Sequence, residues 1–401
     1  MKKTFLMIAL AFAGISAYAQ EAEQKVAEAP DFTVVKENPI TSIKNQNQAG
    51  TCWCYSSLAF IESELIRMGK GEYDLSEMYI VHNTYLDRAD KAVRTHGDAS
   101  FSQGGSFYDV IYGMKTFGLV PEAEMLPGVM YGEKLSVHNE LSAVSGAVVE
   151  AIAKGKQRSL QVAADKQPLW KKCIESIHDI YLGKRPEKFT YNGKEYTPKS
   201  FYESLGLNAD DYVSLTSYTH HPFYAPFVLE IQDNWRWATS YNLPIDEFMQ
   251  VFDYAIMEGY TIAWGSDVSE SGFTRDGKAT MPDAEKSASF EGSDMAKWLK
   301  LSDADKKNTP KPSTEKWCTQ EERQVAYDNW ETTDDHGMQI YGIAKDKDGV
   351  EYYMVKNSWG EAGKYKGIWY ASKAFARYKT MNIVVHKNAI PKDIRKKLGI
   401  K

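Results

Sequence analysis

A cysteine placed where a helix begins is the first feature of this sequence that can do chemistry. Cys52 lies in the stretch KNQNQAGTCWCYSS, directly before apolar residues that recur at helical spacing from 53 to 66. Unpaired backbone N–H groups and the helix dipole stabilise a thiolate at such a position. Because a free thiol has a pKa of about 8.5, a nearby imidazolium is needed to lower it further. Cys52 is therefore predicted to be a nucleophile with a histidine partner.

The histidine partner is predicted to be His336. Of the eight histidines in the chain, it lies at the start of an apolar strand pattern and is followed by the stretch KNSWG. That stretch supplies Asn357 and Trp359. In a cysteine, histidine and asparagine arrangement, the amide oxygen accepts a hydrogen bond from the imidazole and holds it toward the sulfur, while a tryptophan shields that bond from water. We expect Cys52, His336 and Asn357 to be catalytic, with Trp359 as the shield.

The order and spacing of these motifs resemble the papain superfamily of cysteine peptidases. Gln46 stands six residues before Cys52, and the stretches GTCWCYSS, DDHGMQIYG and KNSWG follow in the order of that superfamily. The resemblance implies that the Gln46 side chain and the backbone N–H of Cys52 stabilise the oxyanion of a tetrahedral intermediate. It also implies that Gly104 and Gly105, in SQGGSFYDV, line the cleft and bind extended substrate through their backbone.

Longer stretches are similar to the branch of bleomycin hydrolase and bacterial aminopeptidase C. They are LGKRPEKFTYNGKEYTPKSFYES, DYVSLTSYTHHPFY and YNLPIDEFMQVFDYAIMEGY, and the resemblance covers nearly the whole mature chain. It implies peptide substrates, aminopeptidase action, no cofactor, and a homo-hexamer with the active sites inside. His220 and His221 lie in the stretch HHPFY, which resembles the same stretch in that branch. No second cluster of metal ligands accompanies Cys52 and Cys54. No metal site is therefore predicted.

The expected fold is α+β, with the two lobes of papain and a large, mainly helical insertion. Residues 32–132 are predicted to form a helical lobe with the nucleophile, 133–240 the insertion, and 241–401 a β-rich lobe with His336 and Asn357. Helical patterns cover 50–71, 107–117 and 243–259, and further helical text runs around 148–182. Strand patterns at 260–264, 337–346, 351–359 and 367–372 indicate an antiparallel barrel or half-barrel.

The first residues have the layout of a cleavable secretory signal. Residues 1–19 contain two lysines, then an apolar run, then a small-x-small ending at 17–19. Residues 20–31 are predicted to form a flexible leader. The apolar run is too short to span a bilayer, so we expect no membrane insertion and a periplasmic or secreted product. A net charge of −6 without a long basic cluster gives no electrostatic case for binding nucleic acid.

The chain has four cysteines, too few for a disulfide scaffold in a protein of this size. Cys54 shares the helix of the nucleophile but faces another side, so it is expected in the core. Cys173 and Cys318 can either pair or remain buried free thiols, and free thiols are favoured. Ala49 and Ser102 stand where secreted relatives of papain carry a disulfide, and its absence agrees with the aminopeptidase C branch.

The end of the chain departs from the resembled branch. The stretch VVHKNAIPKDIRKKLGIK stops short of the tail that enters the cleft there and offers its terminal carboxylate to the amine of the substrate. Without that tail, either endopeptidase activity appears or the insertion blocks the cleft, and we predict relaxed aminopeptidase specificity. Two other functions stay open: an amidase or acyltransferase on the same triad, and a non-catalytic peptide-binding oligomer.

Overall fold

The computed structural model describes residues 31–155, 160–282 and 315–401, so the predicted signal 1–19 and nearly all of the leader 20–31 lie outside it. The helices are α1 (Cys52–Arg67), α2 (Glu77–Arg94), α3 (Phe107–Thr116), α4 (Asn139–Ala153), α5 (Leu169–Leu182), α6 (Pro198–Leu205), α7 (Ile245–Met257), α10 (Gln320–Asp328), α11 (Lys373–Lys379) and α12 (Lys392–Lys397). The strands are β1 (Phe32–Glu37), β2 (Phe189–Tyr191), β3 (Lys194–Tyr196), β4 (Tyr212–Thr216), β5 (Pro226–Val228), β6 (Thr239–Asn242), β7 (Ile262–Ser266), β8 (Lys278–Ala279), β9 (His336–Asp346), β10 (Glu351–Lys356), β11 (Ile368–Ser372) and β12 (Thr380–His386). In the part of the chain so described, no helix combines the length and apolar character needed to cross a membrane.

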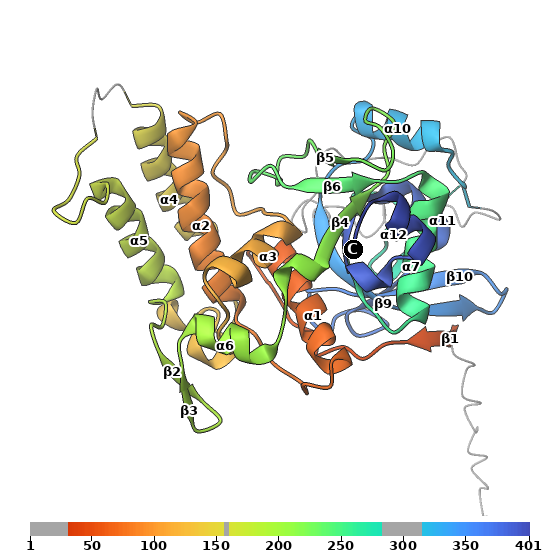
Figure 1. The fold of residues 1–401 in the computed structure, drawn as a ribbon, viewed down its shortest axis with the longest axis horizontal. Coiled ribbons are helices and arrows are strands. Elements are labelled where there is room, and N and C mark those ends of the chain that lie inside the picture. Colours follow the sequence, from red (N-terminus) through yellow and green to blue (C-terminus); the bar gives the residue numbers. More distant parts are fainter. Residues whose placement is uncertain (1–30, 156–159, 283–314) are drawn as a thin grey trace, which may run out of the picture. The chain divides into compact units, whose positions relative to one another are not determined.

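One mixed sheet contains ten strands of the described chain. Its order is β5-β6-β4-β12-β7-β9-β10-β11-β8, and β1 pairs with β9 beside this path (Figure 1). The pairs β4–β6 and β8–β11 are parallel, whereas β7, β9 and β10 pair antiparallel. The register sets Ser266 opposite His336 and Lys356 opposite Gln339. The start of β9 and the end of β10 therefore lie side by side at the same end of the strands.

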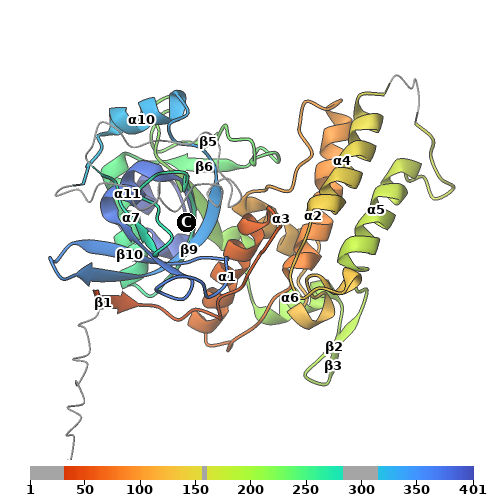
Figure 2. The same ribbon diagram turned by 180° about the vertical axis from the view of Figure 1, so that it is seen from behind.

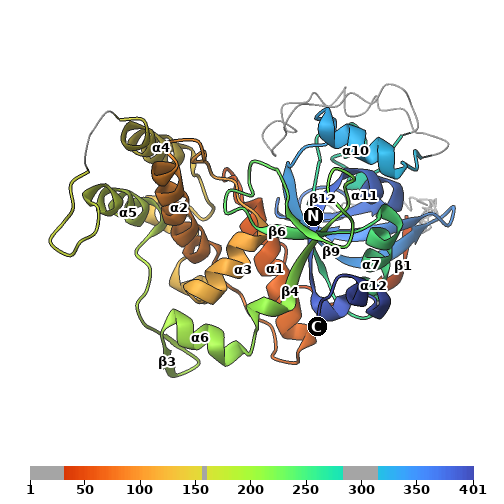
Figure 3. The ribbon, with the colours of Figure 1, turned by 45° about the horizontal axis from the view of Figure 1, so that its top comes forward.

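The central strands carry a helix on each face because their side chains alternate. On β7, Ile262 and Trp264 belong to a buried cluster with α7, whereas Ala263 between them belongs to the cluster that contains α1. On β9, Gln339 also reaches α1, where its Nε2 donates to the carbonyl of Ala59 at 3.2 Å. Figure 3 shows α7 and α12 close together, and residues of both belong to one buried cluster. The first helix thus lies between the sheet on one side and α2 and α3 on the other, on the face opposite α7.

A second group of helices packs at the side of α1. α2 lies against α4 and α5 through a cluster that includes Ala89, Trp170 and Ile174, and Figure 2 shows these three helices side by side. α3 packs on both α1 and α2. Its first turn is fixed by Asp109, which accepts a hydrogen bond from the backbone N–H of Ser106 at 2.7 Å. This packing positions the glycine pair that directly precedes α3.

The predicted elements around the site are confirmed. α1, α3 and α7 overlap the predicted helical ranges, β7, β9, β10 and β11 overlap the predicted strands, and the text around 148–182 forms α4 and α5. The α+β class is also confirmed. The division into lobes differs in detail, because β1 pairs with β9 and residues 212–242 add β4, β5 and β6 to the same sheet. The segment 133–240, predicted as a mainly helical insertion, therefore ends in strands of the sheet.

All four cysteines are free thiols, so Cys173 and Cys318 do not form a bridge. Cys54 is fully buried, as its predicted place in the core requires, and Cys318 is buried too. The predicted burial of Cys173 is wrong, since this residue is exposed on α5. The reason is the orientation of α5, whose buried face is taken by Trp170 and Ile174 against α2.

Candidate active site

Cys52 is the first residue of α1, and nearly all the residues that follow it in this helix are buried. Within the described chain, the preceding Thr51 provides no side-chain cap, which leaves the first N–H groups of the helix available to a negative charge. Ser56 donates to the carbonyl of Cys52 at 2.7 Å and strengthens the first turn. The sulfur is therefore attached to a rigid element, the best support for a reactive group.

His336 and Asn357 are in direct contact, as the sequence analysis expected. Nε2 of His336 lies 2.7 Å from Oδ1 of Asn357, and both residues are buried. The antiparallel pairing of β9 with β10 produces this contact, because His336 begins β9 and Asn357 directly follows β10. The ring of Trp359 lies 4.7 Å from the imidazole, tilted by 33°. This indole covers the imidazole, the position expected of a shield.

Cys52 and His336 line the same cavity, which brings together residues almost three hundred positions apart in the chain. Gly105, Asp233 and Asp334 line it as well. Of the predicted glycine pair, Gly105 therefore lies in the cavity of the predicted nucleophile, and Gly104 directly precedes it in the chain. The two carboxyl groups were not predicted: Asp334 stands in the stretch DDHGMQIYG, of which only the histidine was assigned to the site, and nothing in the local sequence marks Asp233.

Gln46 is buried, and both ends of its amide are engaged. Its Oε1 accepts a hydrogen bond from Ser358 Oγ at 2.6 Å, and its Nε2 donates to the carbonyl of Ala49 at 2.7 Å. An amide nitrogen carries two hydrogens, so this contact does not exhaust its donors. Ser358 also donates its backbone N–H to Oδ1 of Asn357 at 2.7 Å. Ser358 was not predicted from the sequence, and it links the predicted oxyanion donor to the predicted triad.

The environment of Cys52 does not by itself favour a thiolate. Loss of hydration is the main cause that raises the pKa of this thiol to about 12; the backbone N–H of Gly337 opposes the rise, and the charges of Asp233 and Asp334 add to it. A thiolate therefore requires transfer of the proton to His336, so that thiolate and imidazolium form as one pair.

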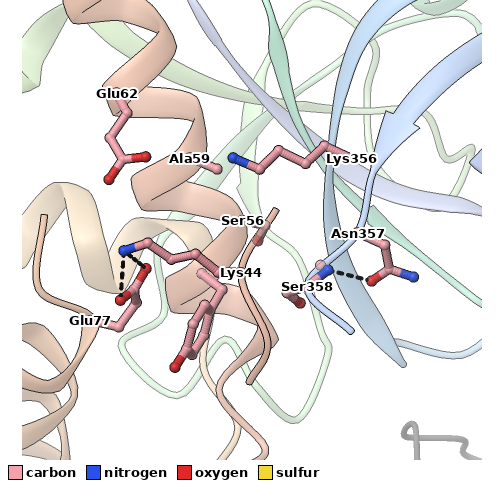
Figure 4. A pocket seen from close by; sticks show the side chains of 10 residues that line it. Lys44, Ser56, Ala59, Glu62, Glu77, Lys356, Asn357 and Ser358 are labelled. Carbon is pink, nitrogen blue, oxygen red and sulfur yellow. Dashed lines mark hydrogen bonds and ion pairs between the residues drawn. The ribbon is translucent and has the colours of Figure 1, made fainter. Parts of the chain in front are cut away.

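A buried polar network lies between α1 and the end of β10, next to Asn357; Figure 4 shows its residues Glu62 and Lys356. Nζ of Lys356 donates to the hydroxyl of Thr41 at 2.9 Å, and this hydroxyl donates to Glu62 at 2.5 Å. Burial raises the pKa of Glu62 to about 7 and lowers the pKa of Lys356 to about 8. Lys356 immediately precedes Asn357, with Ser358 next in line. The network thus fixes the end of β10 from which the triad asparagine projects.

A separate group of side chains gathers His220, His221 and Glu230. Their possible ligand atoms all lie within 4.8 Å of one another. Nε2 of His220 and Nε2 of His221 contact the carboxylate of Glu230 at 3.1 and 3.0 Å. No metal was predicted here from the sequence, and hydrogen bonding to Glu230 accounts for the positions of both imidazoles.

Comparisons with known proteins agree with this architecture. The model of the Peptidase C1-like family matches residues 2–297 and 316–400. The chain is 23% identical over 394 residues to Aminopeptidase G of Lactobacillus delbrueckii subsp. lactis, covering 89% of this chain and 83% of that protein. It is 24% identical over 400 residues to Aminopeptidase C of Streptococcus thermophilus, with the same two coverages. The crystal structure of PepW from Lactobacillus rhamnosis HN001 (DR20) has the same fold, with a TM-score of 0.64 and 21% identity, covering 92% of this chain and 84% of that one.

Proposed function

Because the chain belongs to the Peptidase C1-like family, and with it to the aminopeptidase C branch of papain-type cysteine peptidases, we propose that it hydrolyses peptide bonds through a thioester on Cys52. The observation that carries the proposal is the contact between His336 and Asn357 at 2.7 Å, in the cavity that Cys52 also lines. The contact orients the imidazole, and the cavity that both residues line supports an approach of its ring to the sulfur. This is the geometry that nucleophilic acyl transfer needs.

In the proposed reaction, the Cys52 proton moves to His336 as the sulfur attacks the carbonyl carbon of the substrate. The carbonyl oxygen becomes an oxyanion, stabilised by the backbone N–H of Cys52 and by Nε2 of Gln46. The C–N bond then breaks, and His336 returns the proton to the departing amine. Water, deprotonated by the same imidazole, hydrolyses the thioester and restores the thiol. Asn357 holds the imidazole ring of His336 in the orientation that both proton transfers need.

The chain offers a matched pair of cysteine variants for the test. Cys52→Ala is expected to lower hydrolysis of a defined peptide library by about 10⁴-fold or more, whereas Cys173→Ala, which removes an exposed free thiol, leaves it unchanged. An epoxide cysteine-protease inhibitor is expected to label Cys52 and not Cys173, as peptide mapping by mass spectrometry reports. Hydrolysis that survives in Cys52→Ala would reject the proposal. Products other than hydrolysed peptides would favour an amidase or acyltransferase.

Aminopeptidase action is the finer part of the proposal, and cleavage inside chains is its alternative. Free-amine and N-blocked versions of one peptide separate the two, since only an endopeptidase cleaves the blocked version. We also propose that the protein is exported and assembles as a hexamer, on the resemblance to its branch for the assembly and on the layout of residues 1–19 for the export. Export is tested by determining the N-terminal residue of the mature protein, and the hexamer is tested by determining the mass of the protein in solution.

A further inference from the structure

The loop of residues 229–238 joins β5 to β6 and is fastened to the helices next to the cleft. Figures 1 and 2 show the connection between these strands reaching from the sheet toward α2 and α3. Arg236 binds the buried Asp109 of α3 at 2.6 Å and Asp87 of α2 at 2.8 Å. Inside the loop, the amide of Asn234 donates to the carbonyls of residues 229 and 238 at 2.9 and 2.8 Å. These bonds hold the loop in one place across the cleft.

Asp233 of this loop lies directly on the glycine pair. A Cβ built on Gly104 would come 2.1 Å from Oδ2 of Asp233, so the carboxylate occupies the space over that glycine. The backbone N–H of Gly105 bonds the same carboxylate. Arg88, buried in α2, donates to the carbonyl of Gly104 and contacts Oδ1 of Asp233 at 3.4 Å. The backbone groups with which an extended peptide would pair at this wall are therefore already engaged.

Asp334 brings a second carboxyl group into the cavity from the β9 side. Its neighbours are satisfied by the protein: Asp267 accepts from the backbone N–H of Thr333 at 3.0 Å, and Asp335 accepts from that of Val268 at 3.3 Å. Asp334 accepts no hydrogen bond from any described residue, yet it lines the cavity beside Asp233 and the nucleophile. Burial, followed by the charges of Asp233 and Asp267, raises the pKa of Asp334 to about 8. Among the described residues, no cation is paired with this carboxyl group.

We propose that Asp233 and Asp334 bind the free α-ammonium group of the substrate residue whose carbonyl Cys52 attacks. The inference rests on the proposed function, because the ammonium belongs to the same substrate residue as the carbonyl that Cys52 attacks, and that attack fixes where the ammonium lies. An ammonium has three hydrogen-bond donors and a positive charge, so it can donate to both carboxylates at once. Since Asp233 covers the glycine pair, a second residue on the amino side finds no backbone partner. The substrate class is therefore peptides with a free amino terminus, cleaved one residue at a time.

The test compares an alanine amide of a fluorogenic amine with its N-acetylated form. Native protein is expected to prefer the free-amine substrate in kcat/KM. Asp233→Asn and Asp334→Asn are each expected to lower kcat/KM for that substrate about 10- to 100-fold, the worth of a hydrogen bond to a charged group. Because both carboxylates also raise the pKa of the Cys52 thiol, the N-acetylated substrate is expected to react as fast or faster. Asp348→Asn, on an exposed turn, is the control and leaves both rates unchanged.

The epoxide label on Cys52 separates this inference from the function on which it rests. If the epoxide labels Cys52 in samples of the native protein and of both variants, then unlabelled native protein that cleaves both substrates equally, or unlabelled variants that lose both activities together, would overturn the ammonium site alone. Native protein that resists labelling and cleaves neither substrate would overturn the proposed function and the inference with it. Asp334→Asn removes no hydrogen bond within the described chain, so it remains a valid test if Asp233→Asn fails to fold.

Discussion

Replacing Asn357 by alanine tests the role that the geometry gives to the triad. The substitution removes Oδ1, which lies 2.7 Å from Nε2 of His336. His336 is only 3% exposed, so water does not readily replace the lost acceptor. The imidazole then keeps a buried N–H without its partner and is free to turn away from Cys52. Both effects act on the two proton transfers of the proposed reaction.

The expected loss follows from the cost of that unsatisfied donor. A buried donor without a partner costs about 1–3 kcal/mol, which corresponds to a fall in kcat/KM of about 5- to 150-fold. Asn382→Ala is the matched control, since Asn382 lines the same cavity but bonds Ser214 at 3.1 Å, away from the triad. Hydrolysis of the free-amine substrate and the rate of alkylation of Cys52 against pH are measured for both variants.

The two measurements decide between a positioning role and a merely structural one. If Asn357 orients the imidazole, both the hydrolysis and the alkylation of Cys52 near neutral pH become slower, because the thiolate and imidazolium pair forms less readily. A folded Asn357→Ala protein with hydrolysis within about threefold of native, less than 1 kcal/mol, would refute the reasoning. So would an equal loss in Asn382→Ala.

Two further substitutions test the packing around the site and the buried histidines. Gly105→Ala would bring a Cβ to 2.8 Å from the ring of Trp53, so the free energy of unfolding is expected to fall by about 1–3 kcal/mol. Gly146→Ala is the control and is not expected to destabilise the protein, because nothing lies within 4 Å of the added Cβ. Equal urea midpoints for these two variants would contradict the clash. Burial lowers the pKa of His178 to about 3, below its unfolded value of about 6.5, so its contribution to stability is complete above pH 6.5 and is lost as the pH falls toward 3. His178→Phe should therefore reduce the slope of unfolding free energy against pH between 4 and 6 by about 1.4 kcal/mol per unit, and parallel curves for native and variant protein in urea titrations would contradict this.

The sequence predicts the elements that carry the chemistry because their signals are local. Cys52 is marked by the helical spacing that follows it, and α1 begins at that residue. His336 and Asn357 are marked by the apolar strands beside them, and the pairing of β9 with β10 follows from short turns between adjacent strands. The contact between the two side chains is then a consequence of antiparallel register. These parts of the fold need no knowledge of distant residues.

The loop that carries Asp233 has no such local signal. Its strands are short, three residues in β5 and four in β6, and a run of this length is indistinguishable from a turn by alternation alone. Its anchors are equally distant, since Arg236 and the Asp109 to which it binds are 127 positions apart. An isolated arginine or aspartate in a sequence is most often a solvated surface group. The charge partners appear only when the helices and the sheet are packed together.

The ion pairs of Arg236 contribute more to the position of the 229–238 loop than to the stability of the protein. Asp109 is fully buried and Arg236 nearly so, and the cost of removing two charges from water offsets much of their attraction. Such a pair adds little net stability, but it has one favourable geometry, which an apolar contact does not have. Arg236 therefore determines where the 229–238 loop crosses the cleft, and with it the distance from Asp233 to the sulfur of Cys52. In this protein the nucleophile takes its position from α1 and the sheet, whereas the proposed selection of the substrate takes its position from ion pairs between the loop and the helices.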